Sequence, residues 1–358
     1  MTRRRLARLL GTLALATAAG GAAQALRLPL PWMVGPLLAT ALAGVCGVPL
    51  AASDRLRNAG QWAIGVSLGL YFTPGVGRLF WPLAPAIGAG VLWALVLGYG
   101  FHRLLAALNP AEAPATTYYA AAIGGASEMA VLADRAGAQV DRVAAAHSLR
   151  VLLVVLTLPL AFQLAGVHGA DAFEPAVRVL QPRGLLLLTG LTLAGAALMR
   201  WARLPNPFVL GALGVTAALT LAGIELSALP PGATNAGQLF IGVALGTRFT
   251  PDFARVAPRW LLSVGLGSFA MLGVSALFAT GLAALAGLHP ATTILATSPG
   301  GIAEMCITAQ VLELGVPVVT AFHVVRYVVV LLLTAPLGRW LGLGTGLGVV
   351  SPGPPSGP

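Results

Sequence analysis

Residues 114–129, PATTYYAAAIGGASEM, recur 176 positions later as residues 290–305, PATTILATSPGGIAEM. Both stretches open with Pro-Ala-Thr-Thr and close with Gly-Gly-x-x-Glu-Met. Three further blocks recur at an offset of 176 or 177: residues 28–35 with 204–211, 61–74 with 238–251, and 147–150 with 323–326. Composition bias would not preserve such a spacing, so the chain contains an internal duplication. Its expected parts are membrane repeat 1 (1–175), membrane repeat 2 (176–342) and a Gly/Pro/Ser-rich tail (343–358) whose composition predicts disorder.

The composition predicts an all-α integral membrane protein. Apolar residues make up 57% of the chain and charged residues 9%, against roughly 25% charged in ordinary soluble domains. The 21 basic residues are all Arg, and they lie scattered between apolar segments. This pattern argues against a nucleic-acid partner and indicates loops retained on the cytoplasmic side of a bilayer. The chain has no Lys for a phosphate-binding loop, which disfavours an ATP-driven pump.

Each repeat contains six apolar elements. We expect them at 6–26, 31–49, 56–72, 80–107, 114–136 and 140–165, and again at 183–202, 207–223, 232–248, 259–286, 290–312 and 317–341. The first, fourth and sixth elements reach the roughly 20 residues that a spanning helix needs, and the second and third are short. The fifth is interrupted by a Gly-Gly pair, so it is either a re-entrant hairpin or a broken spanning helix. The first apolar run resembles a cleavable signal peptide, but its counterpart in repeat 2 favours a retained helix.

The arginines predict the orientation of the repeats. If all twelve elements cross the membrane, the loop arginines divide into 10 inside and 9 outside. If the fifth element of each repeat is re-entrant, repeat 2 is inverted and the count becomes 15 against 4. The positive-inside rule therefore favours two inverted repeats of about five spanning helices each, with both termini in the cytoplasm.

The interrupted elements carry the first candidate site. Glu128 and Glu304 follow the Gly-Gly pairs at equivalent positions, and a carboxylate at membrane depth is costly unless it is paired, protonated or bound to a cation. One interpretation is a site for a coupling proton or cation. The alternative is a structural carboxylate that binds the N–H groups freed where the helix is interrupted. No other cofactor is expected.

The sixth elements carry the second candidate site. His147 and Arg150 are three residues apart and share a helix face, as do His323 and Arg326. Arg150 lies near the bilayer midplane, so it should face the interior and either bind an anionic solute or pair with Glu128. Either histidine could relay protons or could be a neutral, hydrogen-bonded core residue.

The third elements are short and glycine-spaced, and their four-residue Gly spacing predicts close helix packing. Their glutamines either pack there or line a cavity. The complete set of candidate substrate- or ion-binding residues is Gln61, Gly124, Gly125, Ser127, Glu128, His147, Arg150, Gln238, Gly300, Gly301, Glu304, His323 and Arg326.

Other sites are not indicated. The five histidines and two cysteines show no metal-binding spacing, and we expect neither a metal nor an enzymatic activity. The expected partners are the lipid bilayer, an unidentified small solute and, as one option, a second copy of the chain.

These doubled motifs resemble the bacterial membrane AbrB family over residues 10–342, and the resemblance implies a location in the inner membrane of a bacterium. Members of that family carry an internal duplication and are often labelled ammonia monooxygenase or regulator of aidB expression. The fold is also similar, by analogy, to secondary transporters with inverted five-helix repeats. The resemblance leaves three functions to compare. The residues favour an ion-coupled transporter of a small anionic solute, with H⁺ or Na⁺ as the coupling ion. The labels imply a membrane regulator of gene expression acting through a partner, or a copper monooxygenase, for which the sequence offers no histidine cluster.

Overall fold

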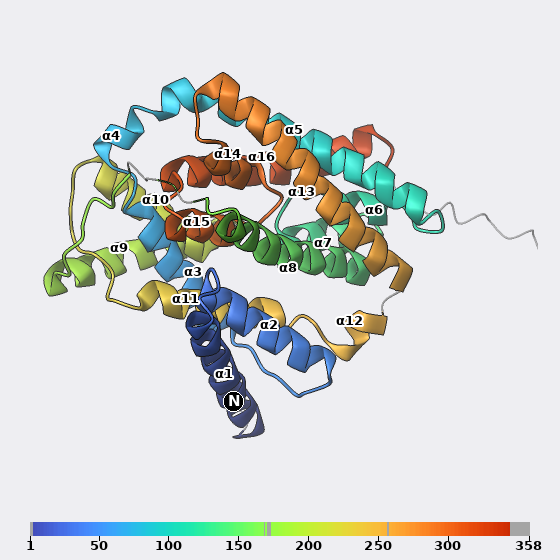
Figure 1. The fold of residues 1–358 in the computed structure, drawn as a ribbon, viewed down its shortest axis with the longest axis horizontal. Coiled ribbons are helices and arrows are strands. Elements are labelled where there is room, and N and C mark those ends of the chain that lie inside the picture. Colours follow the sequence, from blue (N-terminus) through green and yellow to red (C-terminus); the bar gives the residue numbers. More distant parts are fainter. Residues whose placement is uncertain (1–2, 168, 170–172, 256–257, 344–358) are drawn as a thin grey trace, which may run out of the picture.

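A computed structural model describes residues 3–167, 169, 173–255 and 258–343 (Figure 1). These residues form helices and no strand. The first repeat contributes α1 (Arg3–Ala25), α2 (Pro31–Val45), α3 (Asp54–Gly69), α4 (Pro74–Gly77), α5 (Phe80–Leu108), α6 (Pro114–Ala121), α7 (Ala126–Arg135) and α8 (Val140–Leu164). The second contributes α9 (Pro182–Trp201), α10 (Pro207–Leu221), α11 (Ala233–Gly246), α12 (Pro251–Arg255), α13 (Pro258–Ala286), α14 (Pro290–Thr297), α15 (Ile302–Val311) and α16 (Val316–Trp340). Residues 344–358, most of the predicted disordered tail, lie outside the described residues.

The two lists correspond one to one, and every apolar element expected from the sequence forms a helix or a broken helix. The sequence did not predict the short helices α4 and α12, which begin at the repeated Phe-Thr-Pro. Thr73 is the N-cap of α4, since its hydroxyl accepts a hydrogen bond of 3.4 Å from the backbone N–H of Val76. Pro74 follows at the first helical position, where a missing N–H costs nothing. Thr250 repeats this arrangement before α12.

Among the described residues, six helices are long and apolar enough to cross a membrane: α1, α5, α8, α9, α13 and α16, with 20 to 29 residues each. These are the first, fourth and sixth elements of each repeat, as the sequence predicts. Helices α2, α3, α10 and α11 have 14 to 16 residues, which is shorter than a typical spanning helix. The described chain therefore has the features of a multi-pass membrane protein.

The two repeats exchange packing partners. Helix α2 packs on α11 and α3 packs on α10, while α5 contacts α16 and α8 contacts α13. Glycines permit the closest of these approaches. A Cβ atom at Gly65 would lie 2.4 Å from the carbonyl oxygen of Val209, and one at Gly242 would lie 2.6 Å from that of Met33. The helix packing predicted from the glycine spacing is thus confirmed, and it occurs between the repeats.

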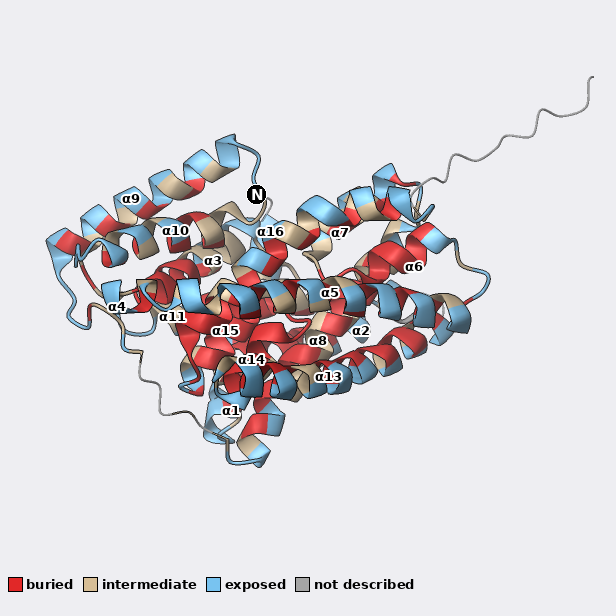
Figure 2. Cartoon of the chain, turned by 90° about the horizontal axis from the view of Figure 1, so that it is seen from above, coloured by how far each residue is buried: buried red, intermediate tan, exposed pale blue. Residues whose placement is uncertain are grey.

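The helices form two groups that meet at one surface. Helices α1, α2 and α3 pack with α9, α10 and α11, and we call these six the outer group. Helices α5 to α8 pack with α13 to α16, and we call these eight the inner group. The broken helix α14–α15 is among the most buried parts of the inner group, whereas α1 and α9 expose most of their surface (Figure 2). Helix α15 also contacts α3 of the outer group, so the second break lies near the surface where the groups meet.

Candidate functional site

Each repeat contains a helix that stops and restarts. Helix α6 ends at Ala121 and α7 begins at Ala126, while α14 ends at Thr297 and α15 begins at Ile302. The connecting backbone is extended, with φ −67° and ψ 138° at Gly125 and φ −78° and ψ 159° at Gly301. Such a break leaves carbonyl groups without partners at the end of the first half-helix and N–H groups without partners at the start of the second. In a membrane-spanning protein these groups need partners from the protein itself.

Arg150 supplies the carbonyl partners in the first repeat. Its Nη1 donates to the carbonyl oxygens of Ala120 and Ala121, both at 3.3 Å, and its Nη2 donates to that of Ala122 at 2.9 Å. The side chain comes from α8 and is 2% exposed. The planar guanidinium carries several donors in fixed directions, so it can satisfy several carbonyls at once.

Arg326 has the same role in the second repeat. It comes from α16, and its guanidinium donates to the carbonyl oxygen of Ser298 and, at 2.6 Å, to that of Gly300. In both arginines the Nε atom is buried and has no hydrogen-bond partner. Two breaks at equivalent positions are therefore closed by two equivalent cations.

The histidines orient these arginines. An Nη2 atom of Arg150 lies 2.9 Å from Nδ1 of His147, and Nε2 of His147 lies 2.9 Å from the carbonyl oxygen of Tyr119. Arginine can only donate, so Nδ1 accepts, and Nε2 then carries the proton that it donates to the carbonyl. His323 binds Arg326 and Leu295 in the same way. Both contacts require the neutral imidazole, so the geometry fits the hydrogen-bonded core interpretation and not a proton relay.

The expected ion pair between Arg150 and Glu128 is not formed. Among the described residues the ion pairs join Arg57 with Asp54, Arg142 with Glu112 and Arg178 with Glu174. The structure thus excludes one of the two alternatives for Arg150, because the carbonyls lie directly beside the guanidinium once the helix breaks.

Each glutamate instead lies at the third residue of a half-helix and folds back over the glycine before it. A Cβ atom at Gly125 would lie 2.0 Å from Oε2 of Glu128, and one at Gly301 would lie 2.0 Å from Oε2 of Glu304. Glycine therefore leaves the space that the carboxylate occupies. The position lies beside the free N–H groups of the helix start, where a negative charge is favourable.

Both breaks open into one cavity of about 510 Å³ between the two helix groups. Ten of the thirteen candidate residues line it: Gln61, Gly124, Gly125, Ser127, Glu128, Arg150, Gly300, Gly301, Glu304 and Arg326. The remaining three do not. His147 and His323 are fully buried behind the arginines, and Gln238 is buried in α11 with its Oε1 atom unpartnered. The structure thus brings the doubled Gly-Gly-x-x-Glu motifs of both repeats to the same place.

Sequence reasoning missed Asn58, which Asn235 matches in the other repeat, and five further polar residues of this cavity: Arg57, Arg200, Asn206, Arg248 and Tyr327. These five residues differ between the repeats, so the repeated sequence blocks did not reveal them. The equivalent positions hold Thr234, Gln24, Leu30, Tyr71 and Val151. Comparing the repeats for unmatched polar residues would have indicated all five.

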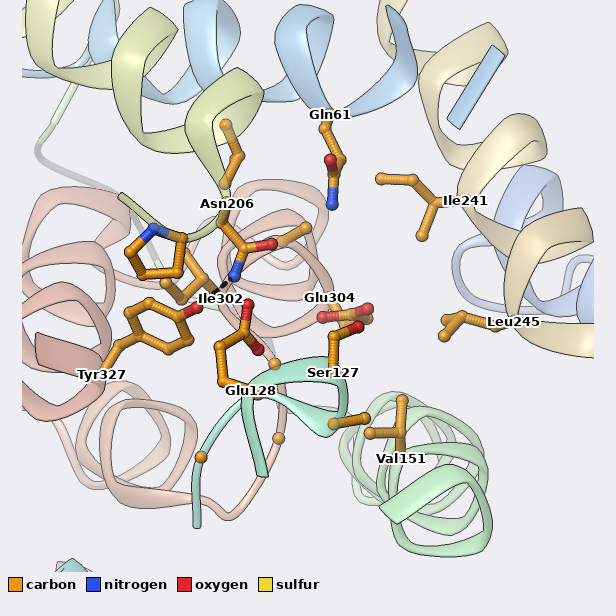
Figure 3. A pocket seen from close by; sticks show the side chains of 18 of the residues that line it. Gln61, Ser127, Glu128, Val151, Asn206, Ile241, Leu245, Ile302, Glu304 and Tyr327 are labelled. Atoms are coloured by element: carbon orange, nitrogen blue, oxygen red, sulfur yellow. Dashed lines mark hydrogen bonds between the residues drawn. The ribbon is translucent and has the colours of Figure 1, made fainter. Parts of the chain in front are cut away.

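Two of the missed residues form a hydrogen-bonded pair beside Glu128. Asn206 directly precedes α10 with φ 48°, a left-handed conformation that Asn tolerates better than most residues. Its Nδ2 donates to the hydroxyl oxygen of Tyr327 at 2.8 Å, so that hydroxyl can donate in turn to Glu128. Figure 3 shows these three side chains together, with Glu304 on the far side, beside Ser127.

The charges of the cavity are mainly positive. Five arginines and two glutamates line it, and the starts of α7 and α15 add the positive ends of two helices. Arg150 and Arg326 are bound to carbonyls, while Arg57, Arg200 and Arg248 come from the outer group or the turn after it. A cavity with this excess favours an anion over a cation.

Comparison with known proteins gives the following matches. A family model described as transition state regulatory protein AbrB matches residues 32–342. An uncharacterized protein of Bacillus subtilis (strain 168), YhjN, is 25% identical over 354 residues, covering 91% of this chain and 91% of its own. A protein of Escherichia coli (strain K12) named "Putative regulator AbrB" is 25% identical over 327 residues, covering 88% of this chain and 91% of its own. No solved structure matches.

Proposed function

The chain belongs to the AbrB family, and on that premise we propose that it is an ion-coupled secondary transporter of a small anionic solute. The observation that carries the proposal is the cavity of about 510 Å³ into which both helix breaks open. Transporters commonly bind solutes where broken helices from two repeats meet, because the half-helix ends offer unsatisfied backbone groups. Because arginines outnumber glutamates in the lining, the cavity favours a negatively charged solute.

The proposal includes an arrangement in the membrane. The two repeats cross the bacterial inner membrane in opposite directions, and both termini are cytoplasmic. The arginine distribution of 15 against 4 supports this arrangement. Pairing of each repeat's second helix with the other repeat's third helix is consistent with two copies related by a pseudo-two-fold axis.

The coupling ion in this proposal is H⁺ or Na⁺, carried at Glu128 or Glu304. Both carboxylates line the cavity, and neither forms an ion pair among the described residues. No chemical step and no cofactor enter the proposal. Groups of three or more His, Cys, Asp or Glu that could hold a metal do not occur in the described part of the chain, so no residue cluster there supports the copper monooxygenase.

A membrane regulator is the second candidate, because the family description reads "regulatory protein" and the name of the Escherichia coli relative contains "regulator". Such a protein would sense a solute in the same cavity and signal through a soluble partner. Co-purification of one stoichiometric partner, with no solute flux, would favour it over transport.

The test is flux in proteoliposomes containing the purified full-length chain. A panel of labelled small anions is presented under an inward pH gradient and, separately, under an inward Na⁺ gradient. We expect at least one anion to accumulate, and the Glu128→Gln and Glu304→Gln double variant to lose gradient-driven accumulation. Glu225→Gln, an exposed residue away from the cavity, is the matched control. Transport is excluded if no anion of the panel accumulates under either gradient.

A further inference from the structure

The two equivalent glutamates of the cavity have different surroundings. Glu128 is half-buried and lies beside the hydroxyl of Tyr327, which accepts a hydrogen bond from Asn206 and can donate to the carboxylate. Glu304 is 8% exposed, and Val151 stands where Tyr327 would have to be to hold it, since Val151 is the repeat equivalent of Tyr327. The duplication therefore preserves both carboxylates, but only Glu128 has a tyrosine hydroxyl beside it.

The Glu304 carboxylate occupies an anion position. It lies over Gly301 at the start of α15. Helix α15 has ten residues, so its start presents several free N–H groups and a positive dipole end, which together form a general site for a carboxylate or another oxyanion. In this state the anion in that site is part of the protein.

The arginines near Glu304 form no ion pair with it among the described residues. Arg326, which lines the same cavity, gives its Nη atoms to carbonyls, and its buried Nε atom has no partner. Arg248, just after α11, is within electrostatic range of both glutamates. Within the described residues its guanidinium has neither an ion pair nor a hydrogen bond. Because this guanidinium is uncommitted and lines the cavity, the cavity has room in its charge balance for a second anion.

We propose that the Glu304 carboxylate is an internal substitute for the carboxylate of the solute. The solute is a small carboxylate that binds between the start of α15 and Arg248. It takes this place when Glu304 gains a proton and releases the N–H groups. One proton and one carboxylate charge then enter the site together, so the site's net charge is unchanged. The proposal rests on the proposed function for the direction of movement, while the binding step stands independently of it.

Several charged or titratable groups surround this exchange. They are Arg57 from α3, Glu128 from α7, Arg150 from α8, Arg200 from α9, Arg248 after α11, Cys306 from α15 and Arg326 and Tyr327 from α16. Of these, Arg150 and Arg326 are fixed by carbonyls and Glu128 by Tyr327. Arg57 pairs with Asp54, and Arg200 is exposed. That leaves Glu304 as the group whose protonation changes when the solute binds, and Arg248 as the half-buried cation that can bind the solute.

The test uses acetate as the minimal carboxylate, with the full-length protein in detergent. The readout is the shift of the unfolding midpoint in sodium acetate relative to sodium chloride at equal concentration. At neutral pH we expect Glu304→Ala to bind acetate at least about tenfold more tightly than the unmodified protein, because its N–H groups are vacant. Acetate stays ionised between about pH 8 and about pH 6, so the unmodified protein should gain affinity over that range while Glu304→Ala shows no such change.

A second variant separates solute binding from simple helix capping. In the Glu304→Ala background, Arg248→Gln should reduce acetate affinity at least about tenfold, whereas Arg183→Gln, an exposed residue away from the cavity, should not. If Glu304→Ala fails to fold, the pH dependence of acetate binding to the unmodified protein and its loss in Arg248→Gln decide the question.

Two results would overturn the inference. One is acetate binding that is equal with and without the Glu304 carboxylate. The other is tighter binding in Glu304→Ala that ignores Arg248, which would identify a purely structural cap. These outcomes do not depend on flux. A protein that transports anions but fails here loses the inference alone, and one that exchanges acetate as described but moves no solute loses the proposed transport alone.

Discussion

The amide of Asn206 donates a 2.8 Å hydrogen bond to the hydroxyl of Tyr327, and this contact joins the outer helix group to the inner one at the edge of the cavity. Asn206 precedes α10 and Tyr327 lies in α16, 121 residues later. The equivalent positions of the other repeat hold Leu30 and Val151, which cannot form such a bond. The two helix breaks are otherwise equivalent, but this contact to the outer helix group exists only beside the break that carries Glu128.

A double-mutant cycle measures this contact. Asn206→Gly keeps a residue that tolerates the left-handed backbone, and Tyr327→Phe removes only the hydroxyl. We expect each to lower the free energy of unfolding by about 0.5–1.5 kcal/mol, with a coupling energy of similar size because both remove one hydrogen bond. Unfolding in detergent is the measurement, and Tyr99→Phe, an exposed tyrosine of α5, is the control. Strictly additive effects would show that the bond contributes nothing.

Arg326→Lys should damage the second break severely. A lysine ammonium cannot bind Ser298, Gly300 and His323 in the geometry of the guanidinium, so at least one buried carbonyl loses its donor. We expect a loss of about 3 kcal/mol, seen as a lower unfolding midpoint or loss of the monodisperse species. Arg339→Lys, on an exposed face of the same helix, should leave the midpoint unchanged. An unchanged midpoint in Arg326→Lys would mean that the carbonyls do not need the arginine.

Gly65→Ala should separate α3 from α10. Its new Cβ atom would lie 2.4 Å from the backbone carbonyl oxygen of Val209, which cannot move without its helix. Overpacking of this kind costs about 1–3 kcal/mol. Gly214→Ala, on the open side of α10 with no atom near its Cβ, should be neutral or slightly stabilising. The comparison is made by thermal unfolding, and equal midpoints for both variants would rule out the close approach.

The proposed inversion of the repeats is tested at two equivalent residues. Arg27 and Arg203 are both exposed and have nearly the same backbone, with φ 55° and 54°. In a background with Cys46→Ser and Cys306→Ser, we expect Arg27→Cys to react with an impermeant maleimide added to intact cells. Arg203→Cys should react only after the membrane is permeabilised, because inversion places it on the cytoplasmic side. Labelling of both from the same side would show that the repeats are parallel.

The sequence alone was sufficient for the elements and for their one-to-one correspondence between the repeats. The duplicated blocks, the apolar lengths and the Gly-Gly pairs predicted the six long helices, the four short ones and both breaks. Each of these features depends on residues close together in the chain, because helix length, helix termination and close packing of small residues leave local patterns. The same locality explains why Glu128, Glu304, Arg150 and Arg326 were identified as unusual.

Only the tertiary structure decided what those residues bind. Arg150 meets the carbonyls of Ala120, Ala121 and Ala122 and not Glu128, because the break turns the freed carbonyls toward α8. Arg248 enters the cavity because α11 packs on α2 and α3, a contact across the repeats that no local pattern encodes. The periodicity of a sequence indicates which face of a helix is apolar. It does not indicate which other helix that face packs against. For this protein the polar partners of the site, and the difference between its two glutamates, therefore came from the packing of the helix groups against each other.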